Sequence, residues 1–202
     1  MSTVDETVSK VDQGLQEMGI GSVKESIYTA AKNAGLENNF IGGHPMAGSE
    51  KTGLANAREF LLENAYYILT PTAQTDPAAL EDFKELVASL GAIPMVLDYE
   101  QHDYATAAIS HLPHIIAYSL VNLVKSCDDC EGTMKTIAAG GFKDITRIAS
   151  SSPEMWESIC LSNADSIDHF LSLMIDELTK MRSYIANEQG GEINRFFASS
   201  RE

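Results

Sequence analysis

The stretch GGHPMAGSE, residues 42–50, directly follows the short apolar run Phe40–Ile41. Glycines and a proline after such a run are typical of a buried strand that ends in a loop. Open α/β sheets bind their ligands at the ends of strands, so this position predicts that His44 faces a ligand site. A lone histidine is more often structural, but an imidazole with an ordinary pKa of about 6.5 also suits proton transfer near neutral pH. His44 is therefore a candidate general base.

Two more β-type runs follow along the chain, at 66–70 and 94–97, and each is bounded by Gly, Pro or Asp. Predicted helices alternate with these strands, one over 53–64 and one over 76–91. The second has Asp76 as its N-cap and a proline at its first helical position. This alternation is typical of an α/β region.

Upstream of the first strand the pattern predicts two helices. Apolar residues recur at steps of three and four over 4–18, which predicts an amphipathic helix that ends near Gly19. Ser22 and Glu25 have the spacing of a capping box, so Ser22 is predicted to cap a second helix. Residues 1–98 together are predicted to form the α/β region.

From residue 99 onward the strand signal disappears, and the pattern predicts an all-helical domain over 99–202. The chain is therefore expected to be helix-dominated overall. The predicted helices lie at 101–126 with a kink at Pro113, at 132–139, just after Gly140–Gly141, just after Ser152–Pro153, and over a long stripe that ends at Gly190–Gly191 before a loose tail. The stripe of that long helix needs a partner surface, which predicts a homodimer.

The composition excludes several classes of partner. A net charge of −15 in 202 residues is unsuited to nucleic acid or to an anionic membrane. The N-terminus has neither a basic leader nor an apolar run, and no stretch approaches about 18 apolar residues, so we expect a cytoplasmic protein. Cys127 and Cys130 have CxxC spacing without a second pair, and a solvated turn is preferred there over a metal or redox site.

Three motifs stand in a recognisable order: GSVK at 21–24, GGHPMAGSE at 42–50 and GGFKDITR at 140–147. With them, residues 21–188 resemble the substrate half of the prephenate dehydrogenase family. The resemblance implies a remnant of a Rossmann-type α/β domain followed by a helical dimerisation domain. It also implies oxidative decarboxylation of prephenate to 4-hydroxyphenylpyruvate in tyrosine biosynthesis, with hydride transfer to NAD or NADP. Arogenate is the alternative substrate.

The resemblance assigns roles to individual residues. His44 would engage the ring hydroxyl of the substrate, and Ser22 would help to hold that hydroxyl. Arg147 would anchor a carboxylate, since a guanidinium can form two parallel hydrogen bonds with it. The further substrate-binding candidates are His114, Trp156, Gly140, Lys143 and Glu50, and Ser49 is the candidate for a cofactor contact. On residue type alone, Arg147 would be expected in a surface ion pair and Trp156 in the core.

Two histidines, His111 and His114, share a helix face, but two ligands without a third do not predict a metal site. His111 is expected to be a packed neighbour of the site.

The chain departs from the family pattern upstream of residue 21. No G-x-G-x-x-G fingerprint for a dinucleotide occurs, and the strand that should precede the GSVK motif is missing from the predicted pattern. We therefore expect a partial sheet with an unpaired edge and a largely absent cofactor site. Two hypotheses remain open: a dehydrogenase whose cofactor domain is encoded upstream or supplied by another chain, or an inactive remnant that still binds prephenate.

Overall fold

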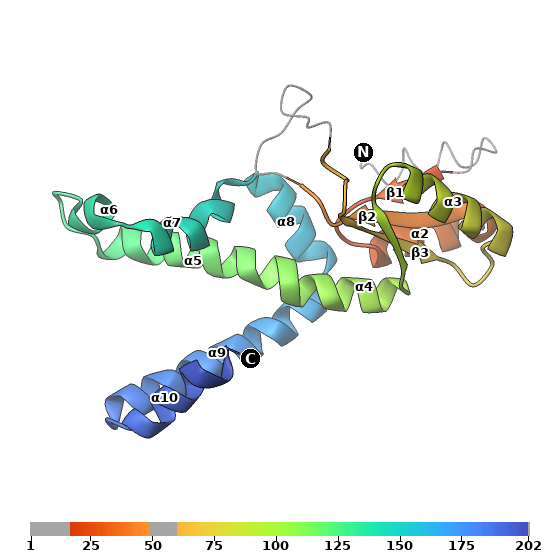
Figure 1. The fold of residues 1–202 in the computed structure, drawn as a ribbon. Helices are drawn as coiled ribbons and strands as arrows, with labels where there is room; N and C mark the ends of the chain where they lie inside the picture. Colours follow the sequence, from red (N-terminus) through yellow and green to blue (C-terminus); the bar gives the residue numbers. More distant parts are fainter. Residues whose placement is uncertain (1–16, 49–59, 202) are drawn as a thin grey trace.

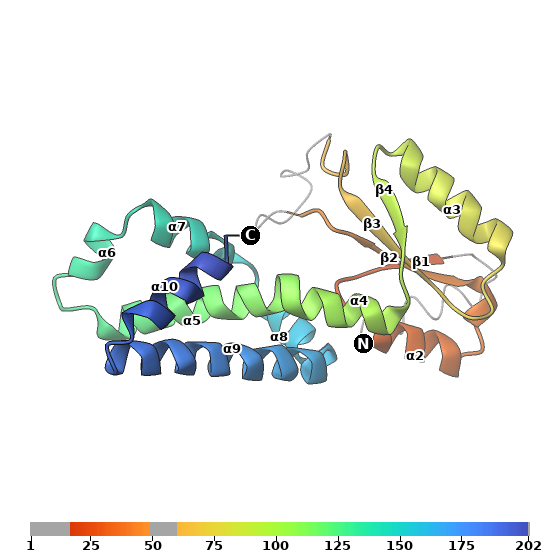
Figure 2. The same ribbon diagram turned by 60° about the horizontal axis from the view of Figure 1, so that its bottom comes forward.

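The computed structural model describes residues 17–48 and 60–201. A small sheet with its flanking helices occupies one end, and a group of helices forms the other (Figure 1). One long helical rod, α4 continued by α5, connects the two ends (Figures 1 and 2). The predicted fold class, an α/β remnant followed by an all-helical part, is confirmed.

The sheet has four strands in the order β1-β2-β3-β4. Their bounds are Glu17–Ile20, Phe40–Pro45, Tyr66–Pro71 and Ile93–Val96. The outer pairs β1–β2 and β3–β4 are parallel, whereas β2 and β3 are antiparallel. The three strands predicted from the sequence are therefore confirmed, with β2 extended through the glycines to His44 and Pro45.

The strand β1 corrects the expectation upstream of residue 21. A helix was predicted to continue through Met18, but residues 17–20 form a strand that runs parallel to β2. The strand that should precede the GSVK motif is thus present, because pairing with β2 overrides the helical periodicity of this segment. Its outer side is an edge of the sheet within the described residues. Residues 4–16 of the predicted helix lie outside the described residues.

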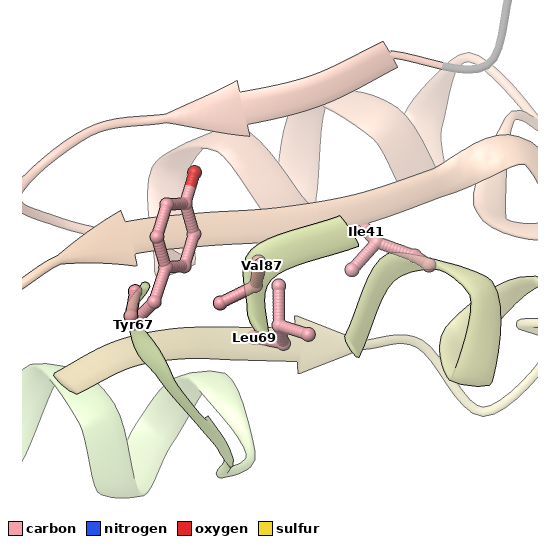
Figure 3. Packing of buried hydrophobic residues seen from close by; sticks show 5 residues of the cluster. Ile41, Tyr67, Leu69 and Val87 are labelled. Atoms are coloured by element: carbon pink, nitrogen blue, oxygen red, sulfur yellow. The ribbon is translucent and has the colours of Figure 1, made fainter. Parts of the chain in front are cut away.

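One face of the sheet packs against α3, Pro77–Ser89. Figure 3 shows Ile41, Tyr67 and Leu69 from two strands gathered around Val87 of the helix. Leu69 and Val87 are fully buried, and burial of such side chains contributes about 1.5–3 kcal/mol each. The Asp76 side chain accepts a hydrogen bond from the Ala78 amide, so the predicted N-cap is confirmed.

The helices that follow the sheet were mostly predicted. On the sheet side lie α2, Glu25–Asn33, and the short 3-10 helix η1, Glu37–Asn39. The helical part contains α4 Tyr99–Thr106, η3 Ala107–His111, α5 Leu112–Cys127, α6 Thr133–Ile137, α7 Gly140–Thr146, η4 Arg147–Ser150, α8 Pro153–Ser162, α9 Ala164–Ala186 and α10 Gly190–Ser199. Ser152 caps α8 through the Met155 amide, as predicted.

Two further helical predictions were wrong. Residues 60–64 form a turn instead of the end of a helix over 53–64, whose other residues lie outside the described ranges. Gly190–Gly191 do not begin a loose tail, because α10 starts there and packs back on α9. Apolar side chains such as Ile193 and Phe196 give this segment an amphipathic face, which explains why it is helical.

The rod formed by α4, η3 and α5 spans Tyr99–Cys127, 29 residues. A π-helical turn, η3, precedes Pro113, where the sequence predicted a kink, and in it the Leu112 amide bonds to the Ala107 carbonyl. By length and composition the rod could cross a membrane. The expectation that no stretch approaches a membrane span is therefore wrong on these two criteria. Core helices of soluble proteins pass the same test, and this one carries buried His102 and Asp103.

Candidate active site

His44 stands at the end of β2 and is part of a chain of hydrogen-bonded side chains. Its Nδ1 lies 2.7 Å from Nε2 of His102, and Nδ1 of His102 lies 2.6 Å from Oδ1 of Asp103. His102 and Asp103 belong to α4 and are only 1 % and 3 % exposed. The chain therefore leads from a buried carboxylate, through one imidazole, to the ring of His44.

The same carboxylate holds the start of α2. The backbone amide of Lys24 donates to Oδ1 and Oδ2 of Asp103 at 2.8 and 3.0 Å, and that of Glu25 donates to Oδ2 at 2.8 Å. The prediction that Ser22 caps this helix is wrong, because the N-cap position is Lys24 and α2 starts on the side chain of Asp103. A carboxylate is well placed at a helix N-terminus, where unpaired amides carry partial positive charge.

Lys24 is a second buried charge next to His44. Its Nζ donates to the carbonyl oxygens of Gly21 and Gly43, at 2.6 and 2.5 Å, and so ties the GSVK motif to the end of β2. Burial lowers the pKa of Lys24 to about 8, and the charge of Asp103 offsets part of that effect. The lysine remains mostly protonated at neutral pH and adds positive charge beside the site.

A cleft of about 530 Å³ opens between the end of β2 and the helical part. Five of the residues predicted for the site line it together: Ser22, His44, His114, Arg147 and Trp156. They come from the loop before α2, from β2, and from α5, η4 and α8. The structure thus brings into one cavity residues that are far apart in the sequence.

One wall of the cleft is aromatic. The rings of His114 and Trp156 stack with centroids 4.0 Å apart, and Nδ1 of His114 donates to the Ser110 carbonyl at 2.8 Å. A flat, largely apolar surface of this kind suits a six-membered ring. Trp156 is also 9 % exposed and packs with Val23 and Ile159, so its expected core role and its place in the cleft wall coincide.

His111 was expected to be a packed neighbour, and the structure adds a further feature. Its Nδ1 lies 3.3 Å from Nδ2 of Asn163, which also donates to the Asp103 carbonyl at 2.8 Å. The Asp103 carbonyl can only accept, so the Asn163 atom that contacts it is the amide nitrogen. That nitrogen also donates to Nδ1 of His111, and the hydrogen of the neutral His111 ring therefore resides on Nε2. Among the described residues, His111 Nε2 and Trp156 Nε1 are buried side-chain nitrogens with no partner. Both residues line the cleft.

The imidazoles of His44 and His111 are held neutral. Burial lowers the pKa of His44 to about 3, with further contributions from His102, Lys24 and His111, while Asp103 acts in the opposite direction. Burial also lowers the pKa of His111 to about 4. A neutral His44 has a lone pair with which it can accept a proton, as a general base requires.

Other predicted residues lie elsewhere. Lys143 and Gly140, both on α7, are exposed and are not among the described residues that line the cleft. A Cβ added at Gly140 would meet nothing within 4 Å, so no contact with described protein atoms requires a glycine there. Ser49 and Glu50 lie outside the described residues, although the described part of their loop, through Gly48, lines the cleft.

The CxxC segment forms the exposed turn between α5 and α6, as predicted. Asp128 Oδ1 and Oδ2 accept the Met134 and Lys135 amides, and Asp129 accepts that of Thr133. The acidic residues of this turn thus cap α6. Within the described residues no group of three potential metal ligands occurs.

The sequence reasoning missed His102 and Asp103. Nothing in their spacing to His44 links them to the loop, because the contact depends on how α4 packs against β2. The one local signal was a His-Asp pair directly after the predicted helix start at residue 101.

Comparison with known proteins agrees with this geometry. Residues 98–199 match the prephenate dehydrogenase dimerization domain, and residues 1–96 match the nucleotide-binding domain of prephenate dehydrogenase. The chain belongs to the prephenate dehydrogenase family. The prephenate dehydrogenase of Bacillus subtilis is 42 % identical over 195 residues, which cover 96 % of this chain and 53 % of that protein. The chain thus spans about half the length of the curated relatives it matches.

Solved structures of the prephenate dehydrogenase family share the fold. The prephenate dehydrogenase of Aquifex aeolicus, solved with hydroxyphenyl propionate and NAD+, has a TM-score of 0.87 and 31 % identity over 99 % of this chain and 72 % of that one. The arogenate dehydrogenase of Synechocystis has a TM-score of 0.82 and 29 % identity over 97 % of this chain and 72 % of that one. The family therefore includes enzymes named for either substrate.

Proposed function

We propose that the cleft binds prephenate and that this chain is the substrate half of a prephenate dehydrogenase. The proposed reaction is oxidative decarboxylation to 4-hydroxyphenylpyruvate, a step of tyrosine biosynthesis. The observation that carries the proposal is the meeting of a neutral His44, a cationic Arg147 and the aromatic wall of Trp156 in one cleft. These supply a base, a carboxylate anchor and a surface for the ring.

His44 acts in the proposal as the general base. With Nδ1 engaged by His102, Nε2 is the ring nitrogen left to take the proton of the substrate hydroxyl. Loss of that proton pushes electron density toward the ring carbon from which hydride departs. A nicotinamide cofactor, when bound, accepts that hydride. Carbon dioxide then leaves as the ring becomes aromatic, which makes the reaction effectively irreversible. Ser22 lines the same cleft and can hydrogen-bond the hydroxyl.

Arg147 supplies a local positive charge that attracts the dianion prephenate, although the chain as a whole has a net charge of −15. Charges are screened beyond about 8 Å at physiological salt, so the residues that line the cleft dominate its field. No Asp or Glu is among the described residues that line it, whereas Arg147 is.

The described residues do not form a site for the cofactor's phosphates. A dinucleotide pyrophosphate is usually held by the open N-terminus of a helix after a strand. Here the helices that follow β1, β3 and β4 each begin on a carboxylate, from Asp103, Asp76 and Asp98 respectively. We infer that NAD or NADP is held mainly by parts of the protein outside the described ranges, with Ser49 still a candidate contact.

A homodimer through the helical domain, taken as residues 99–202 beside an α/β region of residues 1–98, is part of the proposal. Large apolar side chains of α9 and α10 are 48–62 % exposed in the single chain: Leu173, Ile175, Leu178, Ile185 and Phe197. Exposed apolar area on this scale marks an interaction surface. The match to a dimerization domain supports this assignment. A cytoplasmic location is the expectation for such a biosynthetic enzyme.

The proposal is tested by turnover. The 202-residue chain is incubated with prephenate or arogenate and with NAD+ or NADP+, and formation of reduced cofactor and of 4-hydroxyphenylpyruvate is followed. Any turnover of prephenate should fall on the order of 100- to 10,000-fold in His44→Asn. Wild-type rates in His44→Asn would rule out the base. Prephenate binding without any turnover would favour the inactive remnant instead.

A further inference from the structure

The proposed reaction uses His44 but leaves two buried groups of the site without a role. Asp103 and His102 are almost fully buried on α4, and short hydrogen bonds join Asp103 to His102 and His102 to His44. A buried carboxylate is costly unless it is fully satisfied. Its partners therefore indicate what it is for.

The hydrogen bonds fix where each proton lies. The Asp103 carboxylate only accepts, so Nδ1 of His102 donates to it over 2.6 Å. With one ring hydrogen on His102, its Nε2 accepts, and the donor over 2.7 Å is Nδ1 of His44. The chain thus places the hydrogen of His44 on Nδ1 and the lone pair on Nε2. Without this chain the two tautomers of His44 would compete.

The second set of partners of Asp103 positions Ser22. Its oxygens accept the amides of Lys24 and Glu25, which begin α2 just after Ser22. These amides keep the carboxylate charged and prevent it from turning away from His102. One side chain therefore orients the base and also fixes the segment that carries the neighbouring hydroxyl.

We propose that Asp103 is a positioning residue which, through His102, holds His44 in the tautomer with its Nε2 lone pair available to the substrate. The proposal rests on the proposed role of His44 as base. Asp103 touches neither substrate nor cofactor in this account. It acts on the reaction only through His102 and through the start of α2.

Asp103, at the buried end of this chain of hydrogen bonds, also stabilises the positive charge that forms on His44 during the reaction. When His44 takes a proton at Nε2, its Nδ1–H bond to His102 strengthens, and His102 is backed by the negative Asp103. His102 itself, Lys24 from the loop before α2 and His111 from η3 all disfavour a cationic His44 ring. Of the described groups that act on His44, Asp103 alone favours it.

The test reads the tautomer directly by nitrogen NMR of the ¹⁵N-histidine-labelled full chain, without substrate. The chain has five histidines, and His44→Asn identifies the signals of His44. In the wild type at neutral pH we expect a pyrrole-type shift at Nδ1 of His44 and a pyridine-type shift at Nε2. In Asp103→Asn and in His102→Phe, which keeps a ring but loses the acceptor, we expect both nitrogens to move to averaged, intermediate shifts.

The matched control is Asp98→Ala, which removes the side-chain cap of the same helix without touching the chain of hydrogen bonds. It should leave the His44 shifts unchanged, and circular dichroism confirms that each variant is folded. A wild-type His44 with its hydrogen on Nε2 would overturn the proposal, even if Asp103→Asn does not fold. So would unchanged His44 shifts in folded Asp103→Asn or His102→Phe. Because no substrate is present, either result is independent of whether prephenate is turned over.

Discussion

His111 combines nearly complete burial with a place in the cleft wall. It is 1 % exposed, and the Asn163 amide hydrogen-bonds its Nδ1. Burial disfavours the charged ring, which is why its pKa is lowered to about 4. The neutral ring leaves an Nε2–H donor in the cleft. This donor is suited to a carboxylate or carbonyl oxygen of the bound substrate.

The lowered pKa of His111 predicts how stability depends on pH. The unfolded chain takes up a proton near pH 6.5, whereas the folded chain does so only near pH 4. Stability is therefore full above pH 6.5 and falls as the pH decreases toward 4, by about 3 kcal/mol from this group. Urea unfolding at pH 7 and pH 4 measures the difference. His111→Asn, which keeps an acceptor for Asn163, should reduce the pH dependence by about that amount; an unchanged dependence would contradict the assignment.

At the scale of elements, β2 and β3 fit together through a glycine. Gly42 pairs with Thr70, and a Cβ added to Gly42 would lie 2.2 Å from the Thr70 Oγ1 and 3.2 Å from Cδ of Lys24. Thr70 is buried, so its hydroxyl has little room to move. The glycine is thus required by close packing behind the His44 loop.

This contact predicts a rescue. Gly42→Ala should destabilise the fold by about 1–3 kcal/mol through overpacking, measured as the free energy of unfolding in urea. Thr70→Ala removes the clashing Oγ1, and the next Thr70 atom, Cβ, lies 3.6 Å away. In the Thr70→Ala background, Gly42→Ala should therefore lower the free energy of unfolding much less than it does in the wild type. Strict additivity of the two changes would show that the clash is not the cause.

The starts of helices were predicted correctly where the capping residue lies next to the helix in the sequence. Asp76 before a proline defined the start of α3, and Ser152 before a proline defined that of α8, because caps act within one turn. The strand β1 was missed because pairing with β2 is a tertiary effect. Ser22 was assigned as a cap because the sequence could not show that Asp103 supplies that function from 78 or more residues away.

The site was predicted only in part for the same reason. His44, Ser22, His114, Arg147 and Trp156 stand in motifs that resemble the family, and they line one cleft. His102 and Asp103 stand in no motif that the sequence marks, and their role follows from the packing of α4 on β2. Lys143 was placed with Arg147 because the two share a motif, yet α7 ends at Thr146 and Arg147 begins η4, so their four-residue spacing does not put them on one face of a continuous helix.

At the scale of the whole molecule, α9 and α10 extend away from α5 at their far end (Figure 1). Leu178 and Ile185 lie about two turns apart on one face of α9, and they are 62 % and 61 % exposed. A monomer would leave this face in water. We therefore expect a dimer in solution.

Sedimentation velocity tests the dimer. Leu178→Lys with Ile185→Lys places two charges in the apolar face and should convert the dimer to a monomer. Asp176→Lys introduces the same residue on the polar side of the same helix, which also carries Ser172, Lys180 and Ser183, so it should stay dimeric. A double variant that remains dimeric would place the interface elsewhere.

The substrate cleft is the central claim, and calorimetric titration of prephenate into the 202-residue chain tests it most directly. We expect binding, and a weakening of at least about tenfold in Arg147→Ala, since a charge-assisted hydrogen bond contributes about 1.5–3 kcal/mol. Lys143→Ala is the matched control, because it removes a cation from the same motif outside the cleft lining and should change the affinity little. Absence of binding, or equal affinity in wild type and Arg147→Ala, would contradict the account.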